Sequence, residues 1–214
     1  MKYVLPSSLA MLLAACDAAV APQQGATPAT LAAQATIEAD DLDLESIHFL
    51  IKKGKVKDAA ALEKQINDPK EKLNNVDTDG DGKVDKIQLV EVKKDGGGSD
   101  FKLNIVPSKS KDKDAAILVA VIHLDPDKTT NKLIVKAEFT PVVKNAQSFL
   151  FVHETDIVVK GETFVLVEPN PFYSWFFVVD RPVFVSVVVV DAPAVVIERR
   201  HWHRHRGKGK WKGK

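Results

Sequence analysis

The chain has 214 residues, of which 45% are hydrophobic and 28% are charged. This balance is typical of a folded protein and excludes a wholly disordered chain. At roughly 100–200 residues per domain, the length suits one domain or two small ones. The formal net charge of +1 conceals an uneven distribution, because residues 199–214 hold eight Lys and Arg and neither Asp nor Glu. The single cysteine excludes a disulfide-bonded scaffold and a zinc site built from cysteines.

The N-terminus has the pattern of an export signal. A short positive start is followed by residues 3–15, which are apolar or small and too few to span a bilayer as a helix. Residues 1–15 are therefore predicted to be a signal peptide. The residues Leu13-Ala14-Ala15-Cys16 resemble the lipobox of bacterial lipoproteins, in which the cysteine is lipidated and becomes the mature N-terminus. An ordinary signal peptide cleaved nearby is the alternative.

The resemblance to lipoproteins implies a place for the protein in the cell. Cys16 would carry a membrane anchor, and the protein would lie in a bacterial cell envelope, either periplasmic or exposed at the surface. More than one acyl chain makes a stable anchor, whereas a single chain does not. Residues 16–40 are rich in Ala, Gln, Thr and Pro, so we expect a flexible tether between the anchor and a folded part, 41–198.

Two short helical patterns open the folded part. Residues 41–53 place Leu44, Ile47 and Ile51 on one face, and residues 57–67 repeat the same apolar spacing. A glycine follows the first segment, and an Asn-Asp-Pro sequence stands at the end of the second. Both favour the end of a helix. We expect the two segments to form a helical hairpin.

The apolar period changes to alternation after residue 84. Clean alternation over 101–106 and 132–140 is typical of strands with one buried face, and Asp- and Gly-rich turns separate the segments. The expected fold class is therefore α+β, an N-terminal helical hairpin followed by a mostly antiparallel β-sheet or sandwich. The predicted strands are 84–93, 101–106, 115–124, 132–140, 148–153, 163–168, 173–179, 183–190 and 194–198.

Residues 172–190 form the most apolar stretch of the chain, FYSWFFVVDRPVFVSVVVV. A transmembrane helix is one interpretation, but Asp180-Arg181-Pro182 interrupts the stretch and valine dominates the rest. Two buried strands joined by a turn fit these residues better. Because an exposed stretch of this kind would aggregate, we expect it at the centre of the core.

One motif carries specific chemistry. Residues 77–85 place carboxylates at positions 1, 3, 5 and 9 of a loop, with Gly82 at position 6. Calcium takes about six to eight oxygen ligands, and alternate side chains of a tightly curled loop point inward. The other interpretation is an Asp- and Gly-rich turn without a metal. The predicted calcium ligands are the carboxylates of Asp77, Asp79, Asp81 and Asp85 and the backbone carbonyl of Lys83.

The calcium loop, taken as residues 77–88, resembles an EF-hand loop over its first nine positions. It differs at position 12, where Gln88 replaces the glutamate, and in the strand expected directly after it. The calcium loop of FG-GAP repeats, D-x-D-x-D-G-x-x-D followed by a strand, is a closer match. The motif occurs once and so does not imply a propeller. The resemblance implies a structural calcium site, which we expect to hold the helical hairpin to the first strand.

The C-terminal tail, residues 199–214, reads RRHWHRHRGKGKWKGK and has no apolar periodicity, so we expect it to be solvated. Attachment to polyanions is favoured, because each basic residue near an anionic membrane contributes about 1 kcal/mol and Trp suits the interface. Anionic lipid, lipopolysaccharide or a wall polymer would fit, and nucleic acid would bind only nonspecifically. The residues assigned to this contact are Arg199, Arg200, Arg204, Arg206, Lys208, Lys210, Lys212, Lys214, Trp202 and Trp211.

Two other interpretations of this tail stay open. The basic residues can fold back on the acidic body of the chain. Alternatively, His201, His203 and His205 alternate, so that an extended chain projects them to one side, where they can chelate Zn²⁺, Cu²⁺ or Ni²⁺. The neighbouring arginines repel such a cation, which weighs against this second alternative.

The sequence gives no catalytic motif. It contains no G-x-S-x-G, no phosphate-cradling glycine loop and no H-E-x-x-H. His48, His123 and His153 are separated, and each is interpreted as a packed or surface residue. We therefore expect a noncatalytic binding or structural module, stabilised by calcium and anchored to a membrane. An envelope hydrolase of unrecognised type is the rival class, and the sequence identifies no protein partner.

Overall fold

The structure, a computed structural model, describes residues 36–107, 116–146 and 150–186. All of the described residues belong to one compact unit. The predicted signal peptide, Cys16, the strand 194–198 and the tail 199–214 lie outside the described residues. Ile37 and Ala39 are already buried, so the folded part begins a few residues before residue 41.

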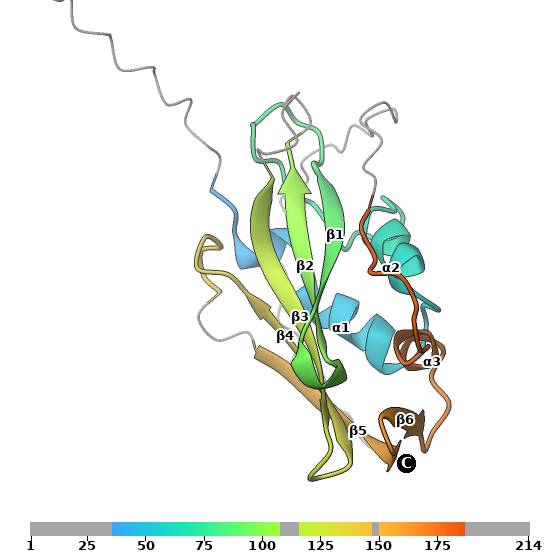
Figure 1. The fold of residues 1–214 in the computed structure, drawn as a ribbon. Helices are drawn as coiled ribbons and strands as arrows, with labels where there is room; N and C mark the ends of the chain where they lie inside the picture. Colours follow the sequence, from blue (N-terminus) through green and yellow to red (C-terminus); the bar gives the residue numbers. More distant parts are fainter. Residues whose placement is uncertain (1–35, 108–115, 147–149, 187–214) are drawn as a thin grey trace, which may run out of the picture. The chain divides into compact units, whose positions relative to one another are not determined.

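An antiparallel meander of six strands forms the body of the described part (Figure 1). Each strand pairs with the next along the chain, and the sheet is curled. The prediction of a mostly antiparallel sheet is confirmed, and the described residues form this one sheet instead of two packed ones. The strands are β1 Lys86–Lys93, β2 Ser99–Val106, β3 Ile117–Asp127, β4 Lys132–Phe139, β5 Leu150–Lys160 and β6 Thr163–Leu166.

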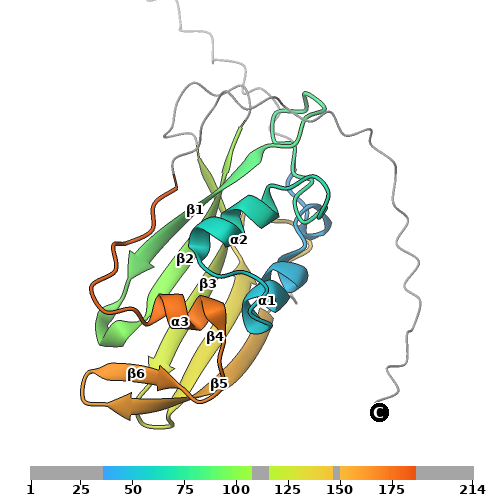
Figure 2. The same cartoon turned by 90° about the vertical axis from the view of Figure 1, so that its right-hand side faces the viewer.

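Short helices cover one face of the sheet (Figure 2). The α-helices are α1 Leu44–Lys52, α2 Ala59–Ile66 and α3 Pro171–Phe176, and two 3₁₀ turns are η1 Ala39–Asp41 and η2 Asp95–Gly97. Helix α1 begins where the Asp43 carboxylate accepts the N–H of Ser46 at 3.0 Å, and α2 begins where Asp58 accepts the N–H of Ala61 at 2.7 Å. These two helices lie within the predicted segments 41–53 and 57–67.

The core lies between the helices and the covered face of the sheet. Phe101, Leu103 and Ile105 of β2 are fully buried, because alternate side chains of a strand point to the same face. Ile47 of α1 and Leu62 of α2 are also fully buried. Full burial of such a side chain contributes about 1.5–3 kcal/mol, so this layer supplies most of the driving force for folding.

The prediction of a buried strand over residues 173–179 is wrong. Pro171–Phe176 form helix α3, which begins at Asn170, whose Oδ1 accepts the N–H of Phe172 at 2.9 Å. Proline fits the first position of a helix, so this start outweighs the β propensity of the aromatic residues. Among the described helices, none is long and apolar enough to cross a membrane.

The described valines of this stretch, Val178, Val179, Val183 and Val185, do not form the centre of the core. Val178 and Val179 are 54% and 66% exposed, whereas the aromatic residues Phe172, Tyr173 and Phe176 of α3 are buried. Residues 183–186, the described part of the second predicted strand, make only an isolated bridge, Val90↔Val185, with β1. The described part of the apolar stretch thus divides between a buried helix and a segment whose valines are exposed.

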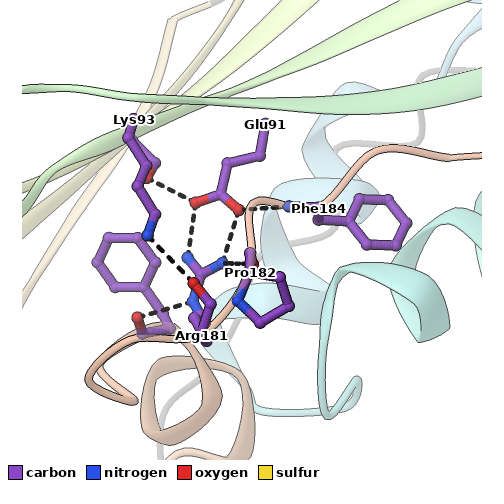
Figure 3. Close-up of polar contacts among 7 residues, drawn as sticks. Glu91, Lys93, Arg181, Pro182 and Phe184 are labelled. Carbon is purple, nitrogen blue, oxygen red and sulfur yellow. Dashed lines mark hydrogen bonds and ion pairs between the residues drawn. The ribbon is translucent and has the colours of Figure 1, made fainter.

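The segment 181–186, which we call the edge segment, lies along the free edge of β1. The N–H of Glu91 donates to the carbonyl of Phe184 at 2.9 Å, and the N–H of Ser186 donates to the carbonyl of Leu89 at 3.2 Å. A buried ion pair between Glu91 and Arg181 fastens the start of the segment (Figure 3). The edge segment thereby satisfies backbone groups that an edge strand would otherwise expose.

Candidate functional site

Three carboxylates converge in the loop between α2 and β1. Asp77, Asp79 and Asp81 each offer one carboxylate oxygen, and these three oxygens lie within 4.8 Å of one another. The three side chains are half-buried. Like charges at this spacing repel one another, so a cation held between them would stabilise the arrangement.

Backbone amides and two glycines shape this loop. The N–H of Asp81 donates to Oδ1 of both Asp77 and Asp79 at 3.1 Å, and the N–H of Gly82 donates to Asp77 Oδ2 at 3.0 Å. Gly80 and Gly82 have φ of +68° and +82°, a region that side chains with a Cβ rarely adopt. The alternation of Asp and Gly in the sequence is therefore what lets the chain curl around the three carboxylates.

Asp85, the fourth predicted carboxylate, has a different place. It is fully buried, and its Oδ2 accepts the N–H of Thr78 at 2.7 Å and the hydroxyl of the same residue. The N–H of Asp85 donates to the carbonyl of Val76 at 2.8 Å. Asp85 thus joins the two ends of the loop, while Lys83 contributes its N–H to Asp81 Oδ1 at 2.9 Å. Three of the four predicted carboxylates come together, and Asp85 is not in that group.

The donor set suits a hard cation. Carboxylate oxygens are the ligands that calcium, magnesium and manganese prefer, whereas softer metals favour sulfur or imidazole. Calcium takes about six to eight oxygens, so water and backbone carbonyls would complete its shell. The three residues therefore fit a divalent cation, and the donor set alone is common to calcium and magnesium sites.

A second cluster joins residues that the sequence analysis treated as separate. His48 of α1 and His153 of β5 are both buried, and Nε2 of His48 lies 2.7 Å from Nδ1 of His153. The hydroxyl of Tyr173 on α3 contacts the other ring nitrogen of His153. The only signal in the sequence was that His48 stands beside the apolar face of its helix, and nothing predicted a partner 105 residues away.

The environment of this cluster keeps all three groups uncharged at neutral pH. Burial lowers the pKa of His153 to about 3, and the nearby His48 and Lys52 add to this effect. Burial and Lys52 also lower the pKa of His48, although a hydrogen bond to the backbone of Val135 acts in the opposite direction. Burial raises the pKa of the Tyr173 hydroxyl far above its usual value.

His123 lies on the opposite, more exposed face of the sheet. Its Nδ1 is 2.7 Å from Asp100 Oδ1, and Lys94 Nζ lies 2.7 Å from the same oxygen. Partial burial would raise the pKa of Asp100, but hydrogen bonds from Lys94 and His123 outweigh this and hold it below its usual value. These contacts fit the interpretation of His123 as a surface residue.

The described residues also form an open pocket of about 230 Å³ between η2, β6 and the end of α3. Lys94 and Arg181 line this pocket, but Lys94 pairs with Asp100 and Asp125, and Arg181 pairs with Glu91. Lys93 lines it as well, and its Nζ donates to the backbone carbonyl of Arg181 at 3.1 Å, so carboxylates neutralise two of the three basic residues that line the pocket.

Comparison with protein-family models, curated proteins and solved structures finds no match for this chain.

Proposed function

We propose that this chain is an exported, lipid-anchored protein of a bacterial cell envelope, whose folded part is a noncatalytic binding or structural module stabilised by calcium. The convergence of Asp77, Asp79 and Asp81 is the observation that carries the calcium site. The sequence Leu13-Ala14-Ala15-Cys16 supports the anchor. Calcium is favoured over magnesium because the loop has the sequence pattern of known calcium loops.

In this proposal calcium fastens the helical hairpin of α1 and α2 to β1. The chain before the loop already pairs with the entry to α1, because the N–H of Asp43 donates to the carbonyl of Leu73 at 2.8 Å. The chain after the loop is tied to α2, because the N–H of Ile87 donates to Asn67 Oδ1 at 2.8 Å. A cation between these two attachments would hold them together. With three carboxylates and no glutamate at position 12, we expect a Kd of about 10⁻⁴–10⁻³ M.

Calcium is expected to raise the melting temperature of the protein. At about ten times its Kd it adds about 1.4 kcal/mol to the free energy of unfolding, or about 3–6 °C in Tm. The double variant Asp77→Asn with Asp81→Asn should lose this shift, since asparagine has nearly the same shape, keeps one acceptor oxygen at each position and removes two charges. Calorimetry with calcium, magnesium or EGTA measures the effect.

A matched control for this experiment is Asp127→Asn. Asp127 also organises an exposed turn, where it accepts the N–H of Thr129 at 2.8 Å, but it lies outside the loop. This variant should respond to calcium as the unchanged protein does. A melting temperature indifferent to calcium and to EGTA would count against the site, and a larger response to magnesium would reassign the metal.

We further propose that the tail, residues 199–214, contacts anionic envelope components, supported by its eight Lys and Arg residues and its two Trp residues. A lipid-free chain beginning at residue 17 should bind vesicles containing anionic phosphatidylglycerol, and salt should weaken the binding. Deleting residues 199–214 should release it, and pure phosphatidylcholine vesicles serve as the control. Equal retention without the tail would remove this part of the proposal, and binding only with added Zn²⁺ would favour the histidines.

A further inference from the structure

Three buried side chains form a hydrogen-bonded chain across three elements that are distant in sequence. His48 comes from α1, His153 from β5 and Tyr173 from α3, and their exposed fractions are 6%, 8% and 1%. The two rings are joined at 2.7 Å, and the Tyr173 hydroxyl contacts His153 Nε2. At the other end of this series of hydrogen bonds, His48 bonds to the backbone of Val135 on β4. We call these three residues the clasp.

The partners of the clasp leave one arrangement of hydrogens in which every group is satisfied. The Val135 carbonyl can only accept, so the His48 ring donates to it from Nδ1 and its Nε2 is an acceptor. His153 must therefore donate from Nδ1 to His48, which leaves its Nε2 to accept the Tyr173 O–H. The tautomers follow from these partners, and both imidazoles are neutral.

A proton added to either ring breaks this arrangement. Protonated His153 would donate from Nε2 toward Tyr173, whose own O–H would then lose its acceptor inside the core. Protonated His48 would donate toward His153 Nδ1 and force the His153 hydrogen onto Nε2, with the same result at Tyr173. Two protons would place two N–H groups face to face at 2.7 Å. The clasp is therefore compatible only with the uncharged pair.

The other charged groups around the clasp do not offset an added proton. On α1 these groups are Glu45 and Lys52, which are both exposed. Lys52 acts on both histidines as a repelling cation, and no carboxylate is among the causes that shift their pKa values. On β5 and β4 the nearest charged residues, Glu154 and Lys136, point to the opposite face by strand alternation. Helix α3 carries no charged residue.

We propose that His48, His153 and Tyr173 form an acid-sensitive clasp, which holds α3 onto α1 and β5 at neutral pH and releases it when an imidazole takes up a proton. An exported protein meets the pH of its surroundings, so such a device would let the module respond to acid. Release would expose the apolar face of α3, formed by Phe172 and Phe176.

The direction of the pH dependence follows from where the protons bind. The pKa of each histidine is lower in the folded protein than the ordinary 6.5, so the open or unfolded chain binds more protons below that pH. The contribution of the clasp is therefore complete above about pH 6.5 and decreases as the pH falls toward about 3, the pKa of His153. Acid, not alkali, opens it.

Hydrogen exchange of the full chain at pH 7.5 and pH 5.0 tests this proposal, with rates corrected for the intrinsic pH effect. Protection of the amides in α3 is expected to fall more than tenfold at pH 5.0, while protection in β2 changes less than threefold. The double variant His48→Gln with His153→Gln should change less than threefold in α3, and His123→Gln should respond as the unchanged protein does.

Several outcomes would overturn the clasp: α3 protection that is independent of pH, an equal loss in β2, or an unchanged response in the double variant. Because that variant can fail to fold, proton NMR of the unchanged protein gives a second test. While the fold is intact, His153 should show no titration above pH 5, and His48 should titrate below the ordinary pKa of 6.5. If all six histidines titrate near pH 6.5, the proposal is wrong.

Discussion

Replacing Glu91 by alanine is expected to lower the free energy of unfolding by about 3–5 kcal/mol, because it leaves a buried arginine without its counter-ion. The side chain of Glu91 is fully buried, and that of Arg181 is 6% exposed. Both guanidinium NH groups lie 2.6 Å from the carboxylate oxygens, in a bidentate pair (Figure 3). The variant removes both contacts at once.

The pair is built into a wider network, which explains the size of the effect. Glu91 also accepts the hydroxyl of Ser99 at 2.7 Å and the N–H of Phe184 at 3.0 Å. Burial would raise the pKa of Glu91, but hydrogen bonds from Arg181, Ser99 and Phe184 outweigh this and hold the pKa below its usual value. The guanidinium carbon of Arg181 lies 4.1 Å from the ring centre of Trp175 on α3. One ion pair therefore joins β1, the edge segment and α3.

Urea denaturation at pH 7.5 measures this cost. The double variant Glu91→Leu with Arg181→Met should recover most of the lost stability, since apolar residues of similar volume often replace a buried pair without loss. The exposed pair of Lys132 and Asp156, at 2.8 Å, is the matched control, and Asp156→Ala should cost less than about 1 kcal/mol. A loss for Glu91→Ala as small as that for Asp156→Ala would refute this account of the edge segment.

Truncating Phe101 to alanine is expected to cost about 3–5 kcal/mol, the second large effect. Phe101 is fully buried on β2, and its ring centre lies 5.9 Å from that of Phe172, 6.1 Å from Trp175 and 6.4 Å from Phe176. All three partners belong to α3. The substitution would therefore leave a cavity at the junction of the sheet and this helix.

Two substitutions calibrate this result. Phe101→Leu keeps most of the volume and should cost much less than alanine. Phe49→Ala removes the same side chain at a position that is 49% exposed, and its effect should stay near 0.5 kcal/mol. Denaturant unfolding measures these effects: if the slope of the free energy against denaturant concentration is unchanged, the shift of the midpoint gives the change in the free energy of unfolding. If Phe101→Ala were as mild as Phe49→Ala, α3 could not pack on β2 as described.

Local patterns in the sequence were sufficient for most of the sheet. In β2, Phe101, Leu103 and Ile105 alternate with polar residues, and this pattern depends only on one face being buried. The end of β5 was missed because Glu154-Thr155-Asp156 interrupts the apolar pattern, whereas the backbone continues the strand to Lys160. Backbone pairing persists where side chains face solvent, so a prediction from apolar alternation underestimates the length of such strands.

The errors arose where contacts distant in sequence decide the structure. In the sequence analysis the valines that follow α3 outweighed its start at Asn170, yet the described ones among them, such as Val178 and Val179, are exposed. Glu91 follows the buried positions Ile87 and Leu89 in alternation, but its partner Arg181 lies 90 residues later. Such pairs leave no local signal, because either residue alone is typical of a solvated position.

The candidate metal site, too, was predictable from the sequence only in part. Asp77, Asp79 and Asp81 were predictable together because they lie within five residues and the glycines between them set the curl of the loop. Asp85 was predicted as a ligand from its position in the motif, whereas the carboxylate is engaged by Thr78. The competition between a metal and a nearby hydroxyl depends on the buried surroundings, which spacing does not describe.

Native mass spectrometry of the protein, purified from the membrane fraction of cells that produce the full chain, tests the central claim most directly, since one spectrum reports both bound ions and covalent lipid. The account predicts one calcium ion per chain, removed by EGTA and absent from the double variant Asp77→Asn with Asp81→Asn, together with the added mass of acyl chains at Cys16. A chain that binds no calcium at millimolar concentration, or that binds it equally well in the double variant, would contradict the account.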